Sequence, residues 1–252
     1  NKSLESRKEK LESALRLSRK ITDLIGIPLE FEDIYDFIGF LPSRMHGAGS
    51  LTKYWAHGQN GFKLRGIEAR QHSTCKWIIS LQKRSLNILK NGLNGSNKCN
   101  SVAVQQQIIT MLHDEIQCLN SGGIKPENLV VTRRVTKAIQ DFSVSTNTQQ
   151  ALIRARKLGQ EILPGRKVRF VSTKPFPGIP ESRVVLLEEL SDYLKIKIDT
   201  EYYESLAVRA IWAILGPFGW TDEEIRQGQK KRTLFDFFDS FNPKPSIDDS
   251  AY

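Results

Sequence analysis

Cysteine, methionine and long apolar runs are scarce in this sequence. The three cysteines, Cys75, Cys99 and Cys118, lie far apart and form neither a metal-binding spacing nor a disulfide framework, so we expect a reducing compartment. No apolar run approaches the roughly 20 residues that cross a membrane, and no signal peptide opens the chain, so we expect no membrane partner. The sequence begins at Asn1 without a methionine, which suggests a fragment or a processed piece of a longer protein.

The motifs of self-sufficient enzymes are also missing from the sequence. It contains no nucleotide-binding glycine loop, no zinc-ligand spacing and no nucleophile elbow. Its four histidines are scattered, so no pair of them is expected to bind a metal ion. Glu30, Glu32 and Asp33 could bind a divalent ion, although consecutive acids on a strand more often form a solvated face. We therefore predict no metal site and no complete catalytic site within this chain.

Positive charge is what the sequence has in excess. Its 252 residues include 37 lysines and arginines against 28 aspartates and glutamates, which gives a formal net charge of +9. The surplus is spread along the chain rather than gathered in one tail, which favours a binding surface over a targeting signal. A basic protein of this kind is expected to bind a polyanion, with nucleic acid favoured over a membrane surface.

The first quarter of the chain is expected to form a helix on a small antiparallel sheet. Leucine and isoleucine residues at helical spacing predict a helix over residues 3–25, which Gly26 and Pro28 end. Alternation of apolar and charged residues predicts a strand over residues 29–32. Further strands are expected over residues 35–41, from residue 53 to the hairpin dipeptide Asn60-Gly61, and over residues 62–67.

From Thr74 onward the pattern is mainly helical. Helices are expected over residues 74–90, 102–119, 146–159 and 199–214, with one more short helix after residue 221. The residues expected to cap helix N-termini are Thr146, Asp199 and Thr221. Short strands are expected over residues 129–131, 167–171 and 184–187, and the tail beyond Asp239 is expected to be disordered. The sequence thus predicts an α+β protein, in which a small antiparallel sheet with a packed helix is followed by a mainly helical region with short strands.

The stretch from Lys63 to His72 is the first candidate for binding a polyanion. Gly66 stands between Arg65 and Arg70, where a residue without a side chain lets the backbone approach a bulky, negatively charged group. Guanidinium groups at that point can hold phosphate through charge-assisted hydrogen bonds. The alternative is an ordinary strand end with a solvated salt bridge from Glu68.

Several short strings occur in the same order, and with compatible spacing, as in one known protein family. They are Lys53-Tyr54, Gly66-Ile67-Glu68-Ala69-Arg70, the segment from Thr132 to Phe142, the run from Gly159 through Pro164-Gly165 to Val171, and Asp199 to Tyr203 with Phe218-Gly219. Each string is weak alone, but the ordered set resembles the C-terminal part of family B DNA polymerases of archaeal type. The resemblance covers nearly the whole chain.

The resemblance implies a function for each region of the chain. Residues 1–72 would be the C-terminal part of the palm, residues 73–228 a thumb that binds duplex DNA, and residues 229–252 a clamp-binding motif with a tail. The residues implied in contacts with primer-template DNA are Lys53, Tyr54, Arg65, Gly66, Arg70, Thr132, Arg133, Arg134 and Lys137. Such contacts grip the phosphate backbone without reading the base sequence. For the last three cations, the alternative is a solvated edge strand.

Catalysis is not expected from this chain alone. The family's mechanism uses aspartates that hold Mg²⁺ ions, and the resemblance places them before Asn1. Glu30 or Glu32 matches an acidic position near the metals and would be an auxiliary at most. The resemblance therefore implies a partner, a larger polymerase segment or subunit with the catalytic aspartates, in a cytoplasmic, nucleoid-associated enzyme. The family usually has arginine and aspartate where Gln71 and His72 stand, which supports the alternative of a noncatalytic DNA-binding or clamp-adaptor protein.

The C-terminal region carries a second candidate site, from Lys231 to Phe238, which is similar to the sliding-clamp-binding box of replication proteins. Leu234, Phe237 and Phe238 are spaced so that one helical turn presents them together to an apolar pocket. Lys231 stands where the box usually has glutamine, and Gln229 lies shortly before it. A sliding clamp is therefore an expected partner. The alternative is a terminal amphipathic turn that packs on its own thumb.

Overall fold

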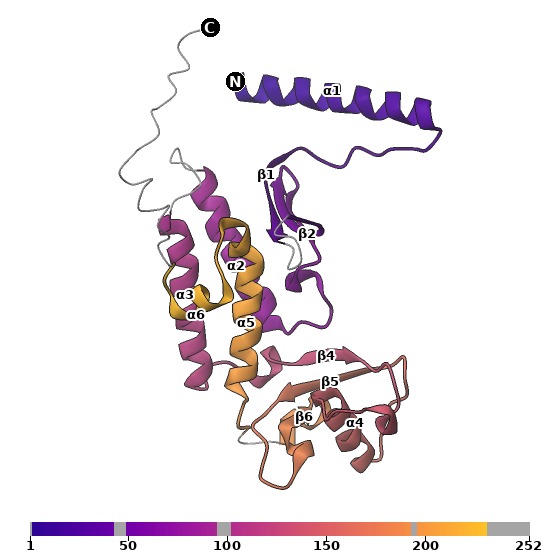
Figure 1. Cartoon of the computed structure of the whole chain (residues 1–252), viewed down its shortest axis with the longest axis vertical. Coiled ribbons are helices and arrows are strands. Elements are labelled where there is room, and N and C mark those ends of the chain that lie inside the picture. Colours follow the sequence, from indigo (N-terminus) through magenta and orange to yellow (C-terminus); the bar gives the residue numbers. More distant parts are fainter. Residues whose placement is uncertain (1, 43–48, 95–101, 193–195, 231–252) are drawn as a thin grey trace. The chain divides into compact units, whose positions relative to one another are not determined.

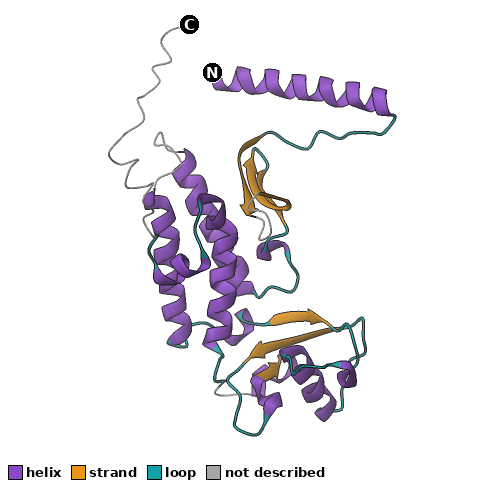
Figure 2. Ribbon diagram, viewed as in Figure 1, coloured by secondary structure: helices purple, strands orange, loops and turns teal. Residues whose placement is uncertain are grey.

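The computed structural model describes residues 2–42, 49–94, 102–192 and 196–230 (Figure 1). Its contacts divide the chain into two compact units, Asn1–Arg70 and Gln71–Tyr252. The assignment of these units to palm and thumb, with a boundary after residue 72, remains a prediction. The predicted α+β class is confirmed, since helices and antiparallel strands occur in both units (Figure 2). Among the described residues, no helix is both long enough and apolar enough to cross a membrane.

The described part of unit 1 consists of a long helix and a three-stranded antiparallel sheet. Its elements are α1 (Lys2–Ile25), β1 (Tyr35–Pro42), β2 (Gly49–Gly58) and β3 (Gly61–Arg65). The sheet order is β1-β2-β3, and β2 turns into β3 at the expected Asn60-Gly61 dipeptide, where Gly61 has a φ of 93°. Glycine adopts this left-handed region without a steric penalty. The predicted helix, the hairpin and the strand at residues 35–41 are thus confirmed.

The core of unit 1 lies around Trp55. Its almost fully buried members are Leu41, Trp55, Ala56 and Ile67. A Cβ atom at Gly39 would lie 2.4 Å from the ring of Trp55, its cross-strand partner. The indole therefore packs directly on the glycine, which explains why a residue without a side chain stands in the middle of β1.

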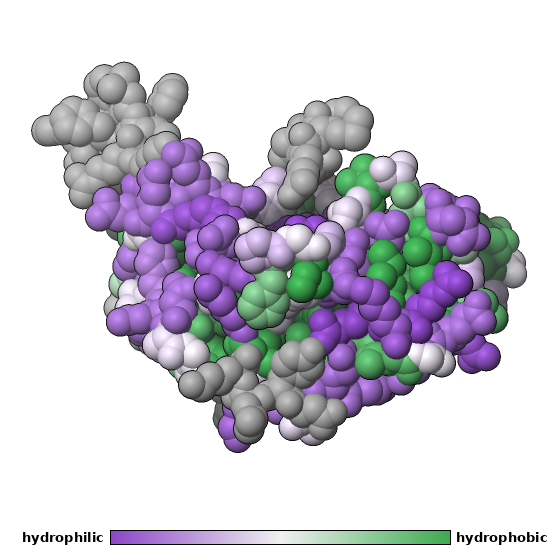
Figure 3. All heavy atoms as spheres, turned by 90° about the horizontal axis from the view of Figure 1, so that it is seen from below, coloured by the Kyte–Doolittle hydropathy of each residue, from purple (hydrophilic) through white to green (hydrophobic). Residues whose placement is uncertain are grey.

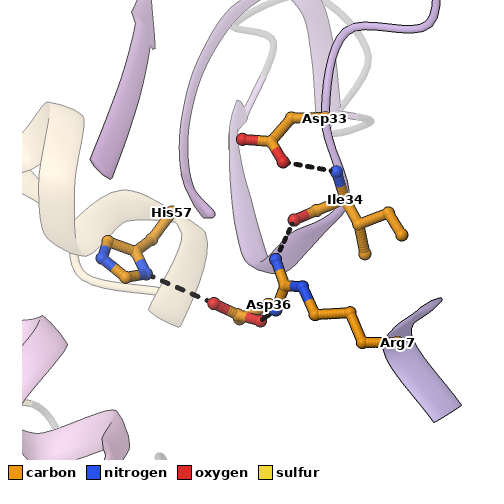
Figure 4. A network of polar contacts seen from close by, with 5 residues as sticks. All are labelled: Arg7, Asp33, Ile34, Asp36 and His57. Atoms are coloured by element: carbon orange, nitrogen blue, oxygen red, sulfur yellow. Dashed lines mark hydrogen bonds and ion pairs between the residues drawn. The ribbon is translucent and has the colours of Figure 1, made fainter. Parts of the chain in front are cut away.

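Arg7 ties α1 to the sheet (Figure 4). Its guanidinium donates a hydrogen bond of 2.5 Å to Asp36 Oδ1, and Asp36 Oδ2 lies 3.5 Å from His57 Nδ1. The leucines of the predicted apolar stripe remain partly exposed, at 39% for Leu11 and 37% for Leu15. Part of the apolar surface of this helix is therefore not buried by the described residues of the chain.

The prediction of a strand over residues 29–32 is wrong, because this segment belongs to none of the described strands. The backbone of Leu29 bonds to α1 instead. Its N–H donates to Thr22 Oγ1 at 3.0 Å, and its carbonyl oxygen accepts from Ser18 Oγ at 2.5 Å. Alternating residues favour an extended backbone, but a strand also requires a neighbouring strand with which to form a ladder.

Unit 2 combines a helical part with a second antiparallel sheet. The helices are α2 (Lys76–Asn94), α3 (Val102–Asn120), α4 (Asn147–Lys157), α5 (Thr200–Leu215) and α6 (Asp222–Gln227), and the strands are β4 (Val131–Arg134), β5 (Lys167–Ser172) and β6 (Val184–Leu186). Helices α2, α3 and α5 pack against one another, and α6 packs on α5 (Figure 1). The sheet has the order β4-β5-β6, and α4 packs on β5 and β6.

Apolar side chains between α4 and the second sheet form a compact cluster. Its buried members are Val135, Ala151, Leu152, Ala155, Val168, Phe170, Val184 and Leu186. Val168, Phe170, Val184 and Leu186 therefore face α4. The opposite face carries the cross-strand pair Val171 and Val185, which is also buried, and the polar residues of β5 nearer the start of that strand.

The helix N-caps predicted from the sequence are confirmed. Thr146 Oγ1 accepts a hydrogen bond of 3.2 Å from the N–H of Gln149, and Asp199 Oδ1 accepts one of 3.1 Å from the N–H of Tyr202. At α6, the Thr221 side chain forms a reciprocal capping box with the third residue after it. Each cap satisfies helix N–H groups that would otherwise have no partner within the helix.

Strand β4 begins later than predicted. The strand expected over residues 129–131 is observed at Val131–Arg134. The N–H of Leu129 bonds instead to the carbonyl of Pro126 at 2.9 Å, which closes a 3₁₀ turn and keeps this residue out of the sheet. The predicted disorder beyond Asp239 lies outside the described residues.

Candidate nucleic-acid interface

In unit 1, four of the predicted DNA contacts lie together where β2 pairs with β3. Tyr54 on β2 is directly opposite Arg65 on β3. Gly66 follows with a φ of 64°, and a Cβ atom there would lie 2.6 Å from the carbonyl oxygen of Thr52 and 2.8 Å from Lys53 Cγ. The close approach that this glycine permits is therefore to β2 of the same chain, which gives a structural reason for glycine at this position.

The cations of this cluster are accessible. Its members Lys53 and Arg65 are exposed, as is Arg70, which follows β3 in the short 3₁₀ helix Glu68–Arg70. Partial burial raises the pKa of Tyr35, the nearby Tyr54 and Asp33 raise it further, and the charge of Arg65 lowers it. The charge of Arg65 thus acts on the phenol of Tyr35 on the neighbouring strand β1. Exposed guanidinium and ammonium groups of this kind can contact phosphates without reading bases.

The acidic residues expected near the metals do not form a metal site among the described residues. Glu32 makes an ion pair with Lys63, and Asp33 Oδ1 accepts a hydrogen bond of 2.7 Å from the N–H of Ile34. Glu30 is exposed in the segment between α1 and β1. No group of three or more histidine, cysteine, aspartate or glutamate side chains in the described ranges could hold a metal ion. The carboxylates of Glu32 and Asp33 are instead engaged within the chain.

In unit 2, one face of the second sheet carries a cluster of positive charge. Thr132 is paired with Arg169, and Arg134 with Lys167, across the antiparallel strands β4 and β5. Directly opposite residues project from the same face of a sheet. Along β5, Lys167 and Arg169 are exposed, whereas Val168 between them is buried. We name Thr132, Arg134, Lys167 and Arg169 the cationic face.

The cationic face is electrostatically unfavourable in the free protein. Arg134 and Lys167 form a like-charged cross-strand pair, an arrangement that destabilises a sheet. Arg169 pairs with Glu188 at 3.2 Å, but their side chains are 54% and 46% exposed, so solvent screens this pair. A polyanion bound to this face would offset the repulsion between the strands.

Two further predicted DNA contacts, Arg133 and Lys137, do not belong to the cationic face and contact aromatic side chains of the chain. Arg133 is paired with the buried Val168, so it projects from the face opposite to the cationic face. Burial raises the pKa of Tyr202, and the charge of Arg133 and its hydrogen bond to the phenol oppose that rise. Lys137 Nζ lies 4.7 Å from the ring centroid of Phe142, which is a cation–π contact. The structure thus separates Arg133 from Arg134, although they are adjacent in sequence.

Lys167 and Arg169 were missed as site residues in the sequence. The available signal was the alternation of basic and apolar residues from Lys167 to Phe170, which is typical of a strand with one charged face. Their position beside Arg134 follows only from the register of β4 against β5, because these strands are far apart in the chain.

Of the predicted clamp-binding residues, Gln229 lies within the described part of the chain. It is exposed after α6, and its N–H bonds to the carbonyl of Glu224 at 3.2 Å. The predicted residues that lie outside the described ranges are Lys231, Leu234, Phe237 and Phe238.

No family model matches this sequence. The chain is 22% identical over 213 residues to a DNA polymerase of Thermococcus litoralis, 20% over 237 residues to one of Archaeoglobus fulgidus and 25% over 209 residues to one of Pyrococcus horikoshii. These matches cover 80%, 88% and 78% of this chain. The fold resembles that of the family B DNA polymerase from the hyperthermophilic archaeon Pyrobaculum calidifontis, with a TM-score of 0.57 and 14% identity over 83% of this chain. The chain is related to the family B DNA polymerases.

Each match covers only part of the polymerase concerned. The chain spans 12%, 28% and 16% of the length of the three curated relatives and 25% of the solved family B polymerase. At 14% identity, the structural likeness shows the fold alone. The sequence and the fold thus relate this chain to a part of a family B polymerase.

Proposed function

We propose that this chain is the C-terminal palm and thumb part, or the small subunit, of a family B DNA-directed DNA polymerase. In this role it grips the primer-template duplex and is tethered to a sliding clamp. The observation that carries the proposal is the cationic face, where the like-charged pair Arg134 and Lys167 stands beside Arg169 on an exposed sheet surface. Binding to the phosphate backbone needs such cations and no base-reading side chains.

The exposed cations of unit 1 would supply further contacts to duplex DNA. Lys53 and Arg65 lie together at the β2–β3 pair, and Arg70 follows shortly after β3. Because each cation displaces condensed counterions from DNA, dispersed contacts of this kind add affinity without adding sequence preference.

Template-directed synthesis would require a further polymerase segment. A polymerase mechanism with metal ions needs carboxylates that hold Mg²⁺ beside the primer end, and the described residues contain no group of three or more histidine, cysteine, aspartate or glutamate side chains that could hold a metal ion. We assign those carboxylates to a larger segment or subunit. The apolar side chains that α1 leaves exposed, Leu11 and Leu15 among them, support such a partner because covering them is favourable. The chain alone is therefore expected to be inactive.

Duplex binding is tested by fluorescence anisotropy with a labelled primer-template over a range of salt concentrations. The variants are Arg134→Ala and Lys167→Ala in the full chain, alone and combined. Each lost phosphate contact is expected to reduce the slope of log affinity against log salt by about 0.9, whatever the base sequence. The matched control, Lys83→Ala, removes an exposed charge from α2 and is expected to leave the slope unchanged. If the double variant binds like the unchanged protein at every salt concentration, the proposal is wrong.

A noncatalytic DNA-binding or clamp-adaptor protein is the second candidate. It is favoured by Gln71 and His72, both exposed, where the resemblance would have arginine and aspartate. Primer extension separates the candidates when this chain is mixed with the polymerase segment that carries the aspartates. Restored nucleotide incorporation supports the polymerase part, and an intact complex without incorporation supports the adaptor. Metal-dependent synthesis by this chain alone would contradict the assignment of the metal-binding carboxylates to another segment.

A further inference from the structure

A proline-rich loop between β5 and β6 presents an aromatic side chain to solvent. This loop, residues Thr173 to Arg183, is named the proline loop here. At its tip, Phe176 is 65% exposed and Ile179 is 48% exposed. Figure 3 views the molecule from below Figure 1, the side on which the proline loop lies, and hydrophobic residues (green) reach the surface there among hydrophilic ones (purple). Exposed apolar residues on a structured loop are a reason to look for a ligand.

Hydrogen bonds hold the tip of the proline loop in one conformation. The N–H of Ile179 donates to the carbonyl of Phe176 at 3.1 Å, and Gly178 between them has a φ of 77°. With Pro177 before it, this glycine fits a type II turn. Ser182 Oγ accepts a bond of 2.7 Å from the N–H of Phe176 and donates one of 2.6 Å to the carbonyl of Ile179. The ring is thus presented on an ordered backbone, which lowers the entropic cost of binding.

The base of the proline loop is closed in the same way. The N–H of Thr173 donates to the carbonyl of Arg183 at 2.8 Å, and Thr173 Oγ1 donates to the carbonyl of Ser182 at 2.6 Å. Glu181 forms an ion pair with Lys157 at the end of α4. The loop is therefore fixed both to its own strands and to the neighbouring helix.

Two lysines lie at the base of the proline loop. The N–H of Lys174 donates to the carbonyl of Lys197 at 2.9 Å, which places these two lysines next to one another. Lys174 Nζ lies 3.7 Å from Glu201 Oε1, but their side chains are 42% and 86% exposed, so solvent screens this pair, and Lys197 is exposed. An exposed aromatic ring accompanied by cations is the combination that binds single-stranded nucleic acid, because bases stack on the ring while phosphates contact the cations.

We propose that Phe176 is a stacking site for an unpaired base of single-stranded nucleic acid. Every base has a flat face, so a single ring serves any sequence, and the adjacent lysines contact the flanking phosphates. In a duplex the faces of internal bases are already stacked on their neighbours, so a ring on a protruding loop favours an unpaired strand. The site follows the C-terminal end of β5, whereas Lys167 of the cationic face begins that strand. The two sites are therefore separate.

The test measures the affinity of the full chain for oligothymidine of about 12 nucleotides by fluorescence anisotropy. A base analogue, 2-aminopurine, placed in the same strand reports stacking through quenching of its fluorescence. Phe176→Ala and Phe176→Leu are both expected to weaken binding about fivefold or more and to abolish the quenching. Phe176→Tyr, which keeps the ring, is expected to retain both.

The affinity for duplex DNA is measured in parallel, so that failure of this stacking site and failure of the proposed duplex binding give different results. Phe176→Ala is expected to leave the affinity for duplex DNA unchanged. It is also expected to leave the thermal unfolding temperature unchanged, because the side chain is largely exposed. Equal binding of oligothymidine by all variants would refute the site. If Phe176→Leu retains the affinity for oligothymidine, the contact is purely apolar, as for a protein partner, and stacking is refuted. An equal loss of duplex affinity would place the loop in the duplex-binding surface and would also overturn the proposal.

Discussion

At Gly66, the backbone conformation and the packing each favour glycine. Its φ of 64° is left-handed, and a Cβ atom would lie 2.6 Å from a backbone oxygen of β2. Gly178 has a similar φ of 77°, but a Cβ atom there would meet nothing within 4 Å. Gly178→Ala is therefore expected to cost only the conformational penalty of about 1–2 kcal/mol. Gly66→Ala is expected to cost more, since β2 must also shift.

Urea denaturation of the two full-length glycine variants measures this difference, with fluorescence followed through the transition of the unit that carries each glycine. Equal losses in the free energy of unfolding would show that the contact of Gly66 with β2 contributes nothing, and that the left-handed conformation alone accounts for glycine there.

Tyr203 joins three elements of unit 2 through one hydroxyl group. Its OH donates to the carbonyl of Leu129 at 2.8 Å and accepts from the N–H of Ser172 at 2.9 Å, in a fully buried site. Tyr203→Phe leaves both backbone groups buried without this partner, so we expect a loss of about 1–3 kcal/mol in the free energy of unfolding. Tyr202→Phe, which removes a less buried phenol, is the control and is expected to cost less. Chemical denaturation at neutral pH measures both.

The same residue predicts a pH dependence at the alkaline end. Burial raises the pKa of Tyr203 well above the usual value of tyrosine, so the folded protein keeps the phenol protonated where the unfolded chain has released the proton. The unfolded state then binds fewer protons, and stability falls as the pH rises above about 10, by at most about 1.4 kcal/mol per pH unit from this group. Tyr203→Phe is expected to flatten this decline. An unchanged slope between about pH 9 and pH 11 would contradict the raised pKa.

At the scale of an element, the β4–β5 ladder carries repulsion that a single charge reversal should relieve. Lys167→Glu turns the like-charged pair with Arg134 into an oppositely charged pair. We expect the free energy of unfolding to rise by about 0.2–1 kcal/mol, because opposite cross-strand charges are favourable. The same change should weaken duplex binding, since a phosphate contact is replaced by a negative charge. A variant that is more stable but binds DNA less tightly would show that the cationic face is kept for binding.

The control for this ladder is Lys83→Glu, which makes the same change of charge on an exposed site of α2. It is expected to leave the free energy of unfolding within about 0.5 kcal/mol of the unchanged protein. If Lys167→Glu destabilises the protein while Lys83→Glu does not, the pair of Lys167 with Arg134 is not repulsive in the free protein.

For the whole molecule, the proposed functions divide between DNA binding and clamp binding. Phe237→Ala combined with Phe238→Ala is expected to reduce affinity for a purified sliding clamp at least about tenfold, because buried aromatic anchors dominate such interfaces. Duplex affinity is expected to be unchanged. Surface plasmon resonance with immobilised clamp measures the first, and Asp248→Asn with Asp249→Asn in the tail is the control. Unchanged clamp affinity in the phenylalanine variant would refute the motif.

The sequence by itself determined the helix caps and the turn that form between residues close together in the chain. The caps at Thr146, Asp199 and Thr221 and the turn at Asn60-Gly61 each depend on groups that are neighbours in the chain, so local chemistry sufficed to place them. The ordered strings also sufficed to relate the chain to family B polymerases, which the comparisons support.

Only the tertiary structure decided which side chains share a surface. The register of β4 against β5 turns Arg133 toward Tyr202 and brings Arg134 beside Lys167, a residue from a distant part of the chain. The backbone of Leu29, predicted in a strand, bonds to α1 instead. In each case the outcome depends on a partner distant in sequence or on a competing bond, and neither is encoded in the local alternation of residues.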